Sequence, residues 1–395
     1  MFSSRTPGDL TPNRLSETLT AARLEGRTIL DLTESNPTRA GFEYPDDLLG
    51  PLADRRSLIY SPGPFGLLDA RTAIARDYAR RGLEVAAERV VLTASTSEAY
   101  ACLFKLLADA GDEVLVPRPS YPLFDHLARL DLVMARPYDL DPDSAWRIDF
   151  DSLQDALTPR TRAVLLVSPN NPTGSFVTAG ELDRLAGLCA GRGLALVADE
   201  VFADYELTVG ARASAGRIVE RRDVLAFSLG GLSKTVGLPQ VKLAWIAVGG
   251  PSELVDRALD RLELICDTYL SVSTPVQVAA AELLDRGGIV RQQIARRVTA
   301  NYQRLAHDVV PVPSCRSLIS EGGWYAVLEV PSVESEEELV LDLLHQDGVL
   351  THPGYFFDFP RESYLVVSLL APEAQFADGL DRILRHFDGA VAGDE

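Results

Sequence analysis

Lysine is scarce in this chain, and one lysine stands where an amine could act as a nucleophile. Of 38 basic residues, only Lys105, Lys234 and Lys242 are lysines. A guanidinium stays protonated, whereas a deprotonated ε-amine can attack a carbonyl group. Lys234 directly follows the small-residue run Gly-Gly-Leu-Ser, between apolar segments. This setting favours a reactive amine over a lysine on the surface. Lys105 lies in an apolar helical segment and is typical of a side chain that extends its charge to solvent.

Polar residues also follow three other predicted strands. Asp199 comes after an apolar run, and a buried acid needs a partner such as a protonated ring nitrogen, or an internal arginine. Asn171 lies in a proline-rich turn and could present its amide to a ligand oxygen, or serve the turn alone. Tyr121 stands between two prolines and could stack on a flat ring, or be an ordinary buried loop tyrosine.

A helix start supplies the remaining chemistry. Ser95, Thr96 and Ser97 open a predicted helix, where free amides and hydroxyl groups suit a phosphate, although Ser95 with Glu98 also fits a simple capping box. A phosphate site, an aromatic ring, an amide, an acid and a lysine are together the groups that pyridoxal phosphate requires. The five histidines show no metal-ligand spacing, and the chain has no GxSxG, GxGxxG or GxxxxGK[ST] motif.

The elements that must position these residues are predicted from hydrophobic periodicity. Apolar runs alternate with helical segments from residue 68 to about 250, which indicates a mostly parallel sheet covered on both faces. The C-terminal third predicts a smaller α+β domain. The strands expected are 28–32, 89–94, 113–117, 163–167, 195–198, 223–227, 243–248, 324–330 and 364–370. The helices expected are 13–28, 68–81, 97–108, 251–270, 275–310 as one helix or a broken pair, 339–346 and 372–387.

Composition limits the class of protein. The 395 residues are 46% hydrophobic and 24% charged, which suits a globular chain of two domains. A net charge of −19 makes nucleic acid or an anionic membrane an unfavourable partner. No apolar stretch predicts a membrane span or a signal peptide, so we expect a cytoplasmic protein.

With these residues in place, the sequence resembles the class I/II aminotransferases, the fold-type I pyridoxal-phosphate enzymes of the aspartate aminotransferase superfamily. The resemblance covers about residues 28–387, and its most specific motifs are Asn171-Pro172-Thr173-Gly174, Asp199-Glu200 and Ser233-Lys234. It implies an α/β fold with a mostly parallel seven-stranded sheet sandwiched by helices, and a smaller α+β domain. The expected division is an N-terminal segment (1–44) packing with the small domain, a large cofactor-binding domain (45–275) and a small C-terminal domain (276–395).

The resemblance also implies residue roles. Lys234 would form the aldimine and move the proton, Asp199 would pair with the pyridine nitrogen, and Asn171 would bond the ring oxygen O3′. Tyr121 would stack on the ring. Tyr60 is similar to a tyrosine that reaches the phosphate of the neighbouring subunit, so a homodimer is implied. Further phosphate contacts would come from Ser95, Thr96, Ser97 and Ser233, and substrate contacts from Asn36 and Trp324.

Three positions depart from the family pattern. Phe202 replaces a tyrosine that donates to O3′, and Lys242 replaces an arginine that holds the phosphate. Val366 stands where the family has the arginine for the substrate carboxylate, and Arg39 is a candidate replacement. The loss of that arginine makes the type of reaction less certain than the identity of the cofactor.

The sequence thus predicts a pyridoxal-phosphate-dependent aminotransferase that moves an amino group between an amino acid and a 2-oxo acid. One alternative is a lyase, decarboxylase or cyclase on the same fold. Another is a binding protein that has lost catalysis, against which the retention of Lys234 and Asp199 argues.

Overall fold

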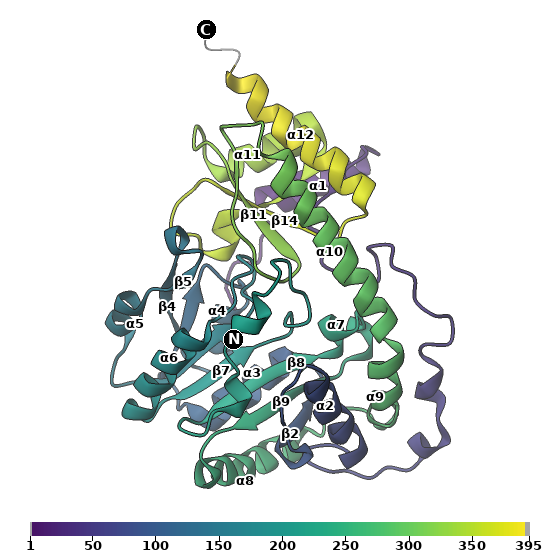
Figure 1. Cartoon of the computed structure of the whole chain (residues 1–395), viewed down its shortest axis with the longest axis vertical. Helices are drawn as coiled ribbons and strands as arrows, with labels where there is room; N and C mark the ends of the chain where they lie inside the picture. Colours follow the sequence, from purple (N-terminus) through teal and green to yellow (C-terminus); the bar gives the residue numbers. More distant parts are fainter. Residues whose placement is uncertain (1, 392–395) are drawn as a thin grey trace.

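The chain folds around a large sheet with helices on both faces. The computed structural model describes residues 2–391. Figure 1 shows the sheet and its helices in the lower half of the molecule and a smaller group of C-terminal helices and strands above them. No helix among the described residues is both long and apolar enough to cross a membrane.

Eight strands form the large sheet. In spatial order they are β2 (Val90–Thr93), β9 (Ala244–Gly249), β8 (Ala226–Gly231), β7 (Ala195–Asp199), β6 (Thr161–Val167), β3 (Glu113–Arg118), β4 (Met134–Asp141) and β5 (Arg147–Ile148). Neighbours from β8 to β4 pair in parallel, whereas β9 is antiparallel to β2 and β8, and β5 to β4. The predicted α/β class with a mostly parallel sheet is confirmed, and the short β5 adds an eighth strand at the edge.

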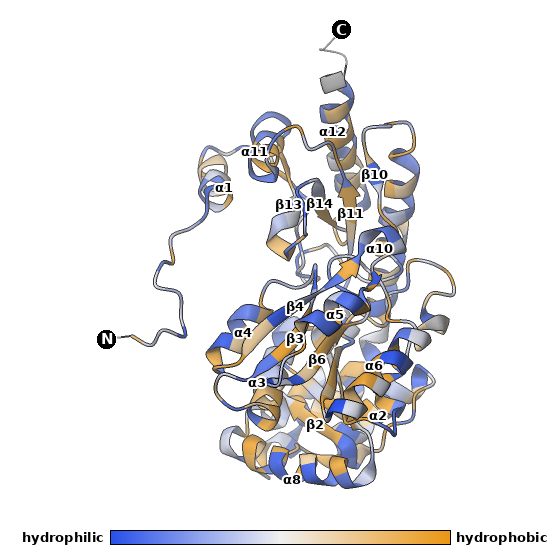
Figure 2. Ribbon diagram, turned by 90° about the vertical axis from the view of Figure 1, so that its left-hand side faces the viewer, coloured by the Kyte–Doolittle hydropathy of each residue, from blue (hydrophilic) through white to orange (hydrophobic). Residues whose placement is uncertain are grey.

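Alternating side chains of the strands build a core on each face of the sheet. In β9, Trp245 and Ala247 pack on one side and Ile246 and Val248 on the other, as a period of two requires. Figure 2 shows that the helices around the sheet carry both hydrophobic and hydrophilic residues. One face carries α2 (Leu68–Arg80), α5 (Phe150–Ala156), α6 (Ala179–Arg192) and α9 (Thr274–Arg286). The other carries α3 (Thr96–Leu107), α4 (Phe124–Leu130) and α8 (Ser252–Tyr269).

The segment that carries Lys234 differs from its prediction. The strand expected at 223–227 begins at Ala226 and continues through Gly231, and Lys234 lies in the short helix α7 (Leu232–Thr235) rather than in a loop. The small residues are part of the strand because β8 lies against a large ring: a Cβ at Gly230 would lie 2.6 Å from the indole nitrogen of Trp245. Close packing therefore explains why a glycine stands inside this strand.

The upper group contains a small antiparallel sheet and the C-terminal helices. Its strands, in order, are β10 (Arg316–Ser317), β11 (Tyr325–Glu329), β14 (Tyr364–Ser368) and β13 (His352–Pro353). Its helices are α10 (Gly288–Asp308), α11 (Glu336–Asp342) and α12 (Glu373–Val391). The segment expected at 275–310 is thus a broken pair, α9 and α10.

The N-terminal segment joins this upper group. β1 (Leu30–Asp31) pairs in parallel with β12 (Val349–Leu350), and α1 (Arg14–Leu24) packs against α11. The residues before α1 extend away from the body (Figure 2). The exact boundaries at 44/45 and 275/276 stay a prediction.

Candidate active site

Lys234 and Asp199 meet at the carboxyl ends of neighbouring parallel strands. Asp199 is the last residue of β7, and its register partner Leu229 lies in β8, which leads into the α7 turn that carries Lys234. The Lys234 Nζ atom lies 4.6 Å from the ring centre of Trp324 and 5.5 Å from that of Phe202. Ligands of open α/β sheets bind at this edge. The predicted amine and acid are therefore brought together with two aromatic rings.

The amine of Lys234 is set up for nucleophilic chemistry. Burial lowers its pKa from 10.5 to about 8, against the opposing charge of Asp199. A substantial fraction of the amine is therefore neutral near pH 8, and only the neutral form has a free electron pair. The amino group forms no hydrogen bond or ion pair with any described residue, so it is free to react with a ligand.

Asp199 is a buried acid that remains able to carry charge. Burial raises its pKa to about 6, while the Val201 N–H (3.1 Å) and the Tyr100 hydroxyl (3.3 Å) donate to its two carboxylate oxygens and oppose that shift. The carboxylate is therefore ionised at neutral pH and lacks an arginine partner among the described residues. Sequence reasoning missed Tyr100. Its only signal was its place on α3, one helical turn after the predicted phosphate residue Thr96.

The start of α3 has the geometry of an anion site. Ser95 is the N-cap, and its Oγ accepts a hydrogen bond of 3.1 Å from the Glu98 N–H. The Glu98 side chain accepts from the Ala94 N–H rather than from the N–H of the N-cap Ser95, so only half of the predicted capping box is formed. The backbone N–H groups of Thr96 and Ser97 remain in the first turn, where the helix dipole favours negative charge. Because Tyr100 of this helix contacts Asp199, the helix start lies close to the acid.

Two buried polar atoms of the site have no hydrogen-bond partner within residues 2–391. Asn171 is buried in the turn after β6, and its side-chain oxygen has no hydrogen bond; the Nε1 atom of the buried Trp324 has none either. Unpaired buried polar atoms carry a free-energy cost of about 1–3 kcal/mol each. With the free amine of Lys234, they leave donors and acceptors for a polar ring. The residues present therefore fit a heterocyclic cofactor with a phosphate.

Aromatic side chains form the walls. The rings of Phe202 and Trp324 lie 5.3 Å apart, and those of Phe202 and Tyr325 6.5 Å apart. Tyr121 is 39% exposed and its ring meets that of Phe124 edge-on at 6.3 Å. One face of Tyr121 is therefore available for stacking on a ligand.

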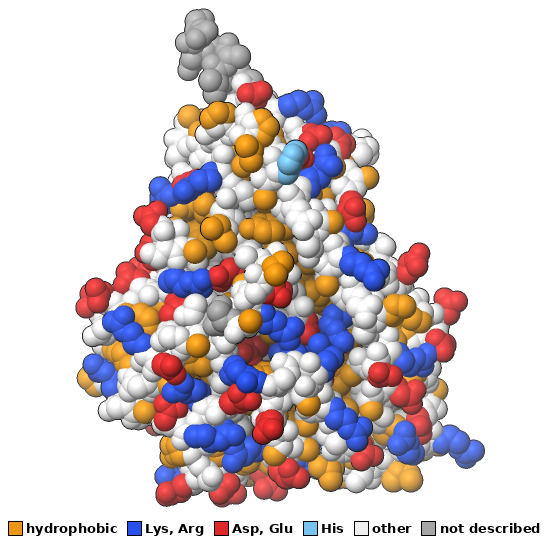
Figure 3. Space-filling model, in the orientation of Figure 1, with side chains coloured by type: hydrophobic (Ala, Val, Ile, Leu, Met, Phe, Trp, Pro, Cys, Tyr) orange, Lys and Arg blue, Asp and Glu red, His pale blue; other side chains and the backbone are white. Residues whose placement is uncertain are grey.

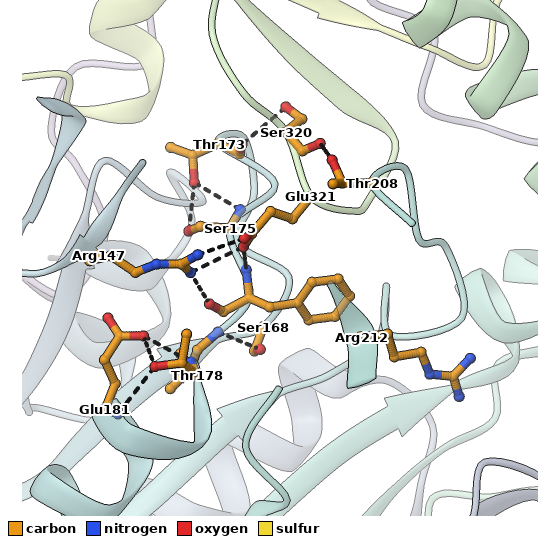
Figure 4. Close-up of polar contacts among 12 residues, drawn as sticks. Arg147, Ser168, Thr173, Ser175, Thr178, Glu181, Thr208, Arg212, Ser320 and Glu321 are labelled. Atoms are coloured by element: carbon orange, nitrogen blue, oxygen red, sulfur yellow. Dashed lines mark hydrogen bonds and ion pairs between the residues drawn. The ribbon is translucent and has the colours of Figure 1, made fainter. Parts of the chain in front are cut away.

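A network of polar contacts anchors the segment that brings Trp324 into the site. Arg147 binds both carboxylate oxygens of Glu321, at 2.6 and 3.1 Å, and also the carbonyl oxygen of Phe176. Ser320 donates to the Thr173 carbonyl at 3.1 Å. Figure 4 shows these side chains converging from the large sheet and the segment before β11. This network was not foreseen, because its partners are far apart in sequence.

Four predicted site residues do not contact Lys234 or Asp199 in the structure. Tyr60 is 72% exposed and lines a surface cavity with Thr93. Lys242 is exposed with a φ of 60°, and Arg39 is exposed; neither side chain has an ion pair with a described residue. Asn36 uses its side-chain oxygen to accept from Thr38, at 2.8 and 3.1 Å.

Val366 is part of the hydrophobic core. It is completely buried in β14, between Val327 of β11 and His352 of β13. Among the described residues, no arginine forms an ion pair or hydrogen bond with Asp199. No group of three or more possible metal ligands occurs among them either.

An amine and an acid lie at adjacent strand ends, beside a helix start, as is expected of an aminotransferase. The family model for aminotransferase class I and II matches residues 30–383. The chain therefore belongs to this family, and it is an aminotransferase.

Individual relatives are also aminotransferases. Glutamate-pyruvate aminotransferase AlaA of Escherichia coli (strain K12) is 27% identical over 375 residues, or 92% of each chain. Alanine aminotransferase of Mycobacterium tuberculosis (strain H37Rv) is 29% identical over 92% of this chain and 87% of the relative. The fold matches that of alanine aminotransferase from Pyrococcus furiosus, with a TM-score of 0.86, 21% identity and coverage of 98% of this chain and 100% of the other.

Proposed function

We propose that this aminotransferase works with pyridoxal 5′-phosphate bound at Lys234, and moves an amino group between an amino acid and a 2-oxo acid. The observation that supports this best is the position of the Lys234 amine. It has no hydrogen bond with a described residue, it lies 4.6 Å from the ring centre of Trp324, and the negative charge of Asp199 acts on it. When bound, the cofactor would supply an electrophilic carbon and an electron-accepting ring.

The chain's own residues would hold that group in a defined way. Asp199 would accept a hydrogen bond from a protonated ring nitrogen, since its carboxylate is ionised at neutral pH. Asn171 would bind the ring oxygen, and Tyr121 would cover one face. The phosphate would lie at the start of α3, with contacts from Ser95, Thr96, Ser97 and Ser233, and with Lys242 and the partner's copy of Tyr60 nearby.

Lys234 would also serve as the base of the reaction. A pKa of about 8 places its proton affinity near the working pH, which is the condition under which a general acid and base is most efficient. Phe202 and Trp324 exclude water around the amine, so a proton taken from the substrate stays within the site. The same amine can return the proton to a neighbouring carbon.

For the substrates, we propose an α-amino acid and a 2-oxo acid of the kind named for the relatives, such as alanine with 2-oxoglutarate or glutamate with pyruvate. Asn36, Arg39 and Trp324 are the residues proposed to contact them. Trp324 offers an unpaired N–H to a substrate oxygen. Arg39 is exposed and unpaired, and would have to swing toward the site to bind a carboxylate.

We further propose a homodimer in the cytoplasm, with neither nucleic acid nor membrane as a partner. Leu58, Ile59 and Tyr60 are consecutive large side chains that are 80%, 70% and 72% exposed. A run of exposed apolar groups marks an interaction surface, and a second copy of the chain would cover it. Figure 3 shows acidic and basic side chains interspersed over one face of the molecule, and the net charge of −19 repels polyanions.

The test is to reduce the protein reconstituted with pyridoxal phosphate using borohydride, and to map the labelled peptide. We expect the label on Lys234 and none in a Lys234→Ala variant, with Lys105 and Lys242 as internal controls. A label on either control lysine, or a protein that takes up no cofactor, would overturn the proposal. A donor screen with alanine and glutamate, read by the cofactor's absorbance, then tests the substrates.

A second candidate is a different pyridoxal-phosphate reaction, such as elimination or decarboxylation. The buried Val366 favours it, because a valine cannot bind the substrate carboxylate as the arginine of the family pattern would. The discriminating measurement is the product of a single turnover without a 2-oxo acid. Ammonia or carbon dioxide would support the second candidate, whereas a stable amino form of the cofactor supports transamination.

A further inference from the structure

A second cavity lies behind the strand end that carries Asp199. It is open to solvent and has a volume of about 460 Å³, and its wall includes Arg81 at the end of α2, Glu200 after β7, and the segment around Arg212. The cavity is not lined by the active-site residues Lys234, Trp324 and Asn171. The cavity is therefore separate from the site described above.

Arg81 is an incompletely satisfied cation in this wall. Its guanidinium packs over the ring of Tyr78 at 4.5 Å, and its Nε atom is buried without a hydrogen bond. None of its side-chain nitrogens forms a hydrogen bond with a described residue, although the charges of Asp204, Glu200 and Asp77 stabilise the guanidinium from a distance. The neighbouring Arg80, by contrast, binds Asp77 at 2.9 Å and Asp204 at 2.8 Å. Arg81 therefore holds donors that a ligand could use.

Arg212 adds a second available cation. Its closest carboxylate is Asp204, at 4.0 Å, which is beyond hydrogen-bond distance. In Figure 4 its side chain points away from the Arg147 network. Burial lowers the pKa of Arg212. The charges of Asp204 and Glu206 oppose this shift, and those of Arg81 and Arg80 add to it. An anion placed between Arg81 and Arg212 would relieve their repulsion.

Carboxylates in the same wall limit the charge of that anion. Glu200 accepts a hydrogen bond from Ser228, and Glu206 accepts one of 3.2 Å from the backbone N–H of Arg212. Both side chains line the cavity. They would repel a dianion such as phosphate more strongly than a single carboxylate. A guanidinium also matches the planar carboxylate with two parallel hydrogen bonds.

The cavity is linked to the active site through two successive residues. Asp199 faces Tyr100 of α3, whereas Glu200 contacts Ser228, which lies 2.9 Å from the Tyr78 hydroxyl of α2 on the opposite face of the sheet. A ligand bound in the cavity would thus lie next to Glu200, the residue that follows Asp199 of the active site.

We propose that this cavity binds a small carboxylate, held by Arg81 and Arg212. The proposal does not depend on the cofactor or the reaction. Acetate is the probe, titrated into the holoenzyme and followed by ligand-observed NMR with [13C]acetate. Arg81→Met is the test variant. Arg76→Met is the matched control, because Arg76 is exposed on the same helix and makes no ion pair.

We expect Arg81→Met to weaken acetate binding at least about tenfold, as expected for a lost charged hydrogen bond, and Arg76→Met to leave it unchanged. Should Arg81→Met fail to fold, Arg81→Lys keeps the charge but loses the paired donors, and at least about threefold weaker binding is expected. Equal binding by wild type and the Arg81 variant would overturn the proposal. Inorganic phosphate that binds as tightly as acetate would overturn the assignment of a carboxylate.

Discussion

Arg147 and Glu321 form a two-pronged ion pair between the large sheet and the segment that leads into β11. Both carboxylate oxygens of Glu321 are used, and one also accepts the N–H of Phe176 at 2.8 Å. The next residues, Gly322 and Gly323, lead directly to Trp324, whose ring covers Lys234. The ion pair therefore fixes the position of an aromatic wall of the active site, although neither partner touches the amine.

We expect Glu321→Gln to raise the KM for the amino donor severalfold and to lower the free energy of unfolding by about 1–2 kcal/mol. The pair is bidentate and largely shielded, so its loss costs more than that of a surface ion pair. Steady-state kinetics and urea unfolding measure the two effects. The control is Arg304→Gln, which breaks an ion pair within one helix turn and should cost less than about 0.5 kcal/mol. Equal effects of the two substitutions would contradict the role of Glu321.

The lowered pKa of Lys234 makes a prediction for the stability of the cofactor-free protein. Because burial disfavours the charged amine, the folded state bears a cost below pH 8, and this cost disappears as the pH rises toward the unfolded value of 10.5. Lys234→Met should thus be more stable than wild type at pH 7 by about 2–3 kcal/mol, because the pKa of about 8 already includes the attraction to Asp199.

Urea unfolding of the cofactor-free proteins at pH 7 and pH 10 measures this difference. The stability gap between Lys234→Met and wild type should shrink at pH 10. The exposed Lys242 supplies the control, since Lys242→Met should change stability by less than about 0.5 kcal/mol at either pH. A difference in stability that grows with pH would contradict the prediction that burial lowers the pKa of Lys234.

Phe202 is expected to set the titration of the bound cofactor. A phenylalanine cannot donate a hydrogen bond to the ring oxygen, so the deprotonated form of the chromophore lacks one stabilising contact. We expect the visible band of the Phe202→Tyr holoenzyme to titrate at lower pH than that of wild type. Phe202→Leu, which also lacks a donor, should titrate like wild type. A spectral pH titration in which all three proteins coincide would refute this.

Val366 is predicted to resist replacement by the family's arginine. The side chain is completely buried beside Val327 and His352. Val366→Arg should lower the free energy of unfolding by about 3 kcal/mol or more, because it buries a charge without a partner. Val333→Arg, at an 81% exposed position, is the control. An unchanged urea midpoint for Val366→Arg would mean that the new guanidinium reaches the active site, and the donor screen should then be repeated with it.

Short-range patterns were sufficient to predict much of the fold. The apolar runs of β6 and β7 and the N-cap Ser95 depend on neighbours in the chain, and they were found. The sequence left open whether residues 275–310 form one helix or two. β4 was not predicted. Its side chains include Pro137 and several that are partly or fully exposed, so it lacks the continuous apolar run of a central strand.

By itself the sequence determined which residue types stand at the strand ends. The end of a strand can be predicted from the few residues around it, so the residue that follows it can be named. The tertiary structure alone decided which of them meet. It placed Tyr100 on Asp199, joined Arg147 to Glu321 across 174 positions, and buried Val366 in the core. Such contacts depend on how separate elements pack, and no local pattern of charge or hydrophobicity encodes the distance between two side chains on different strands or helices.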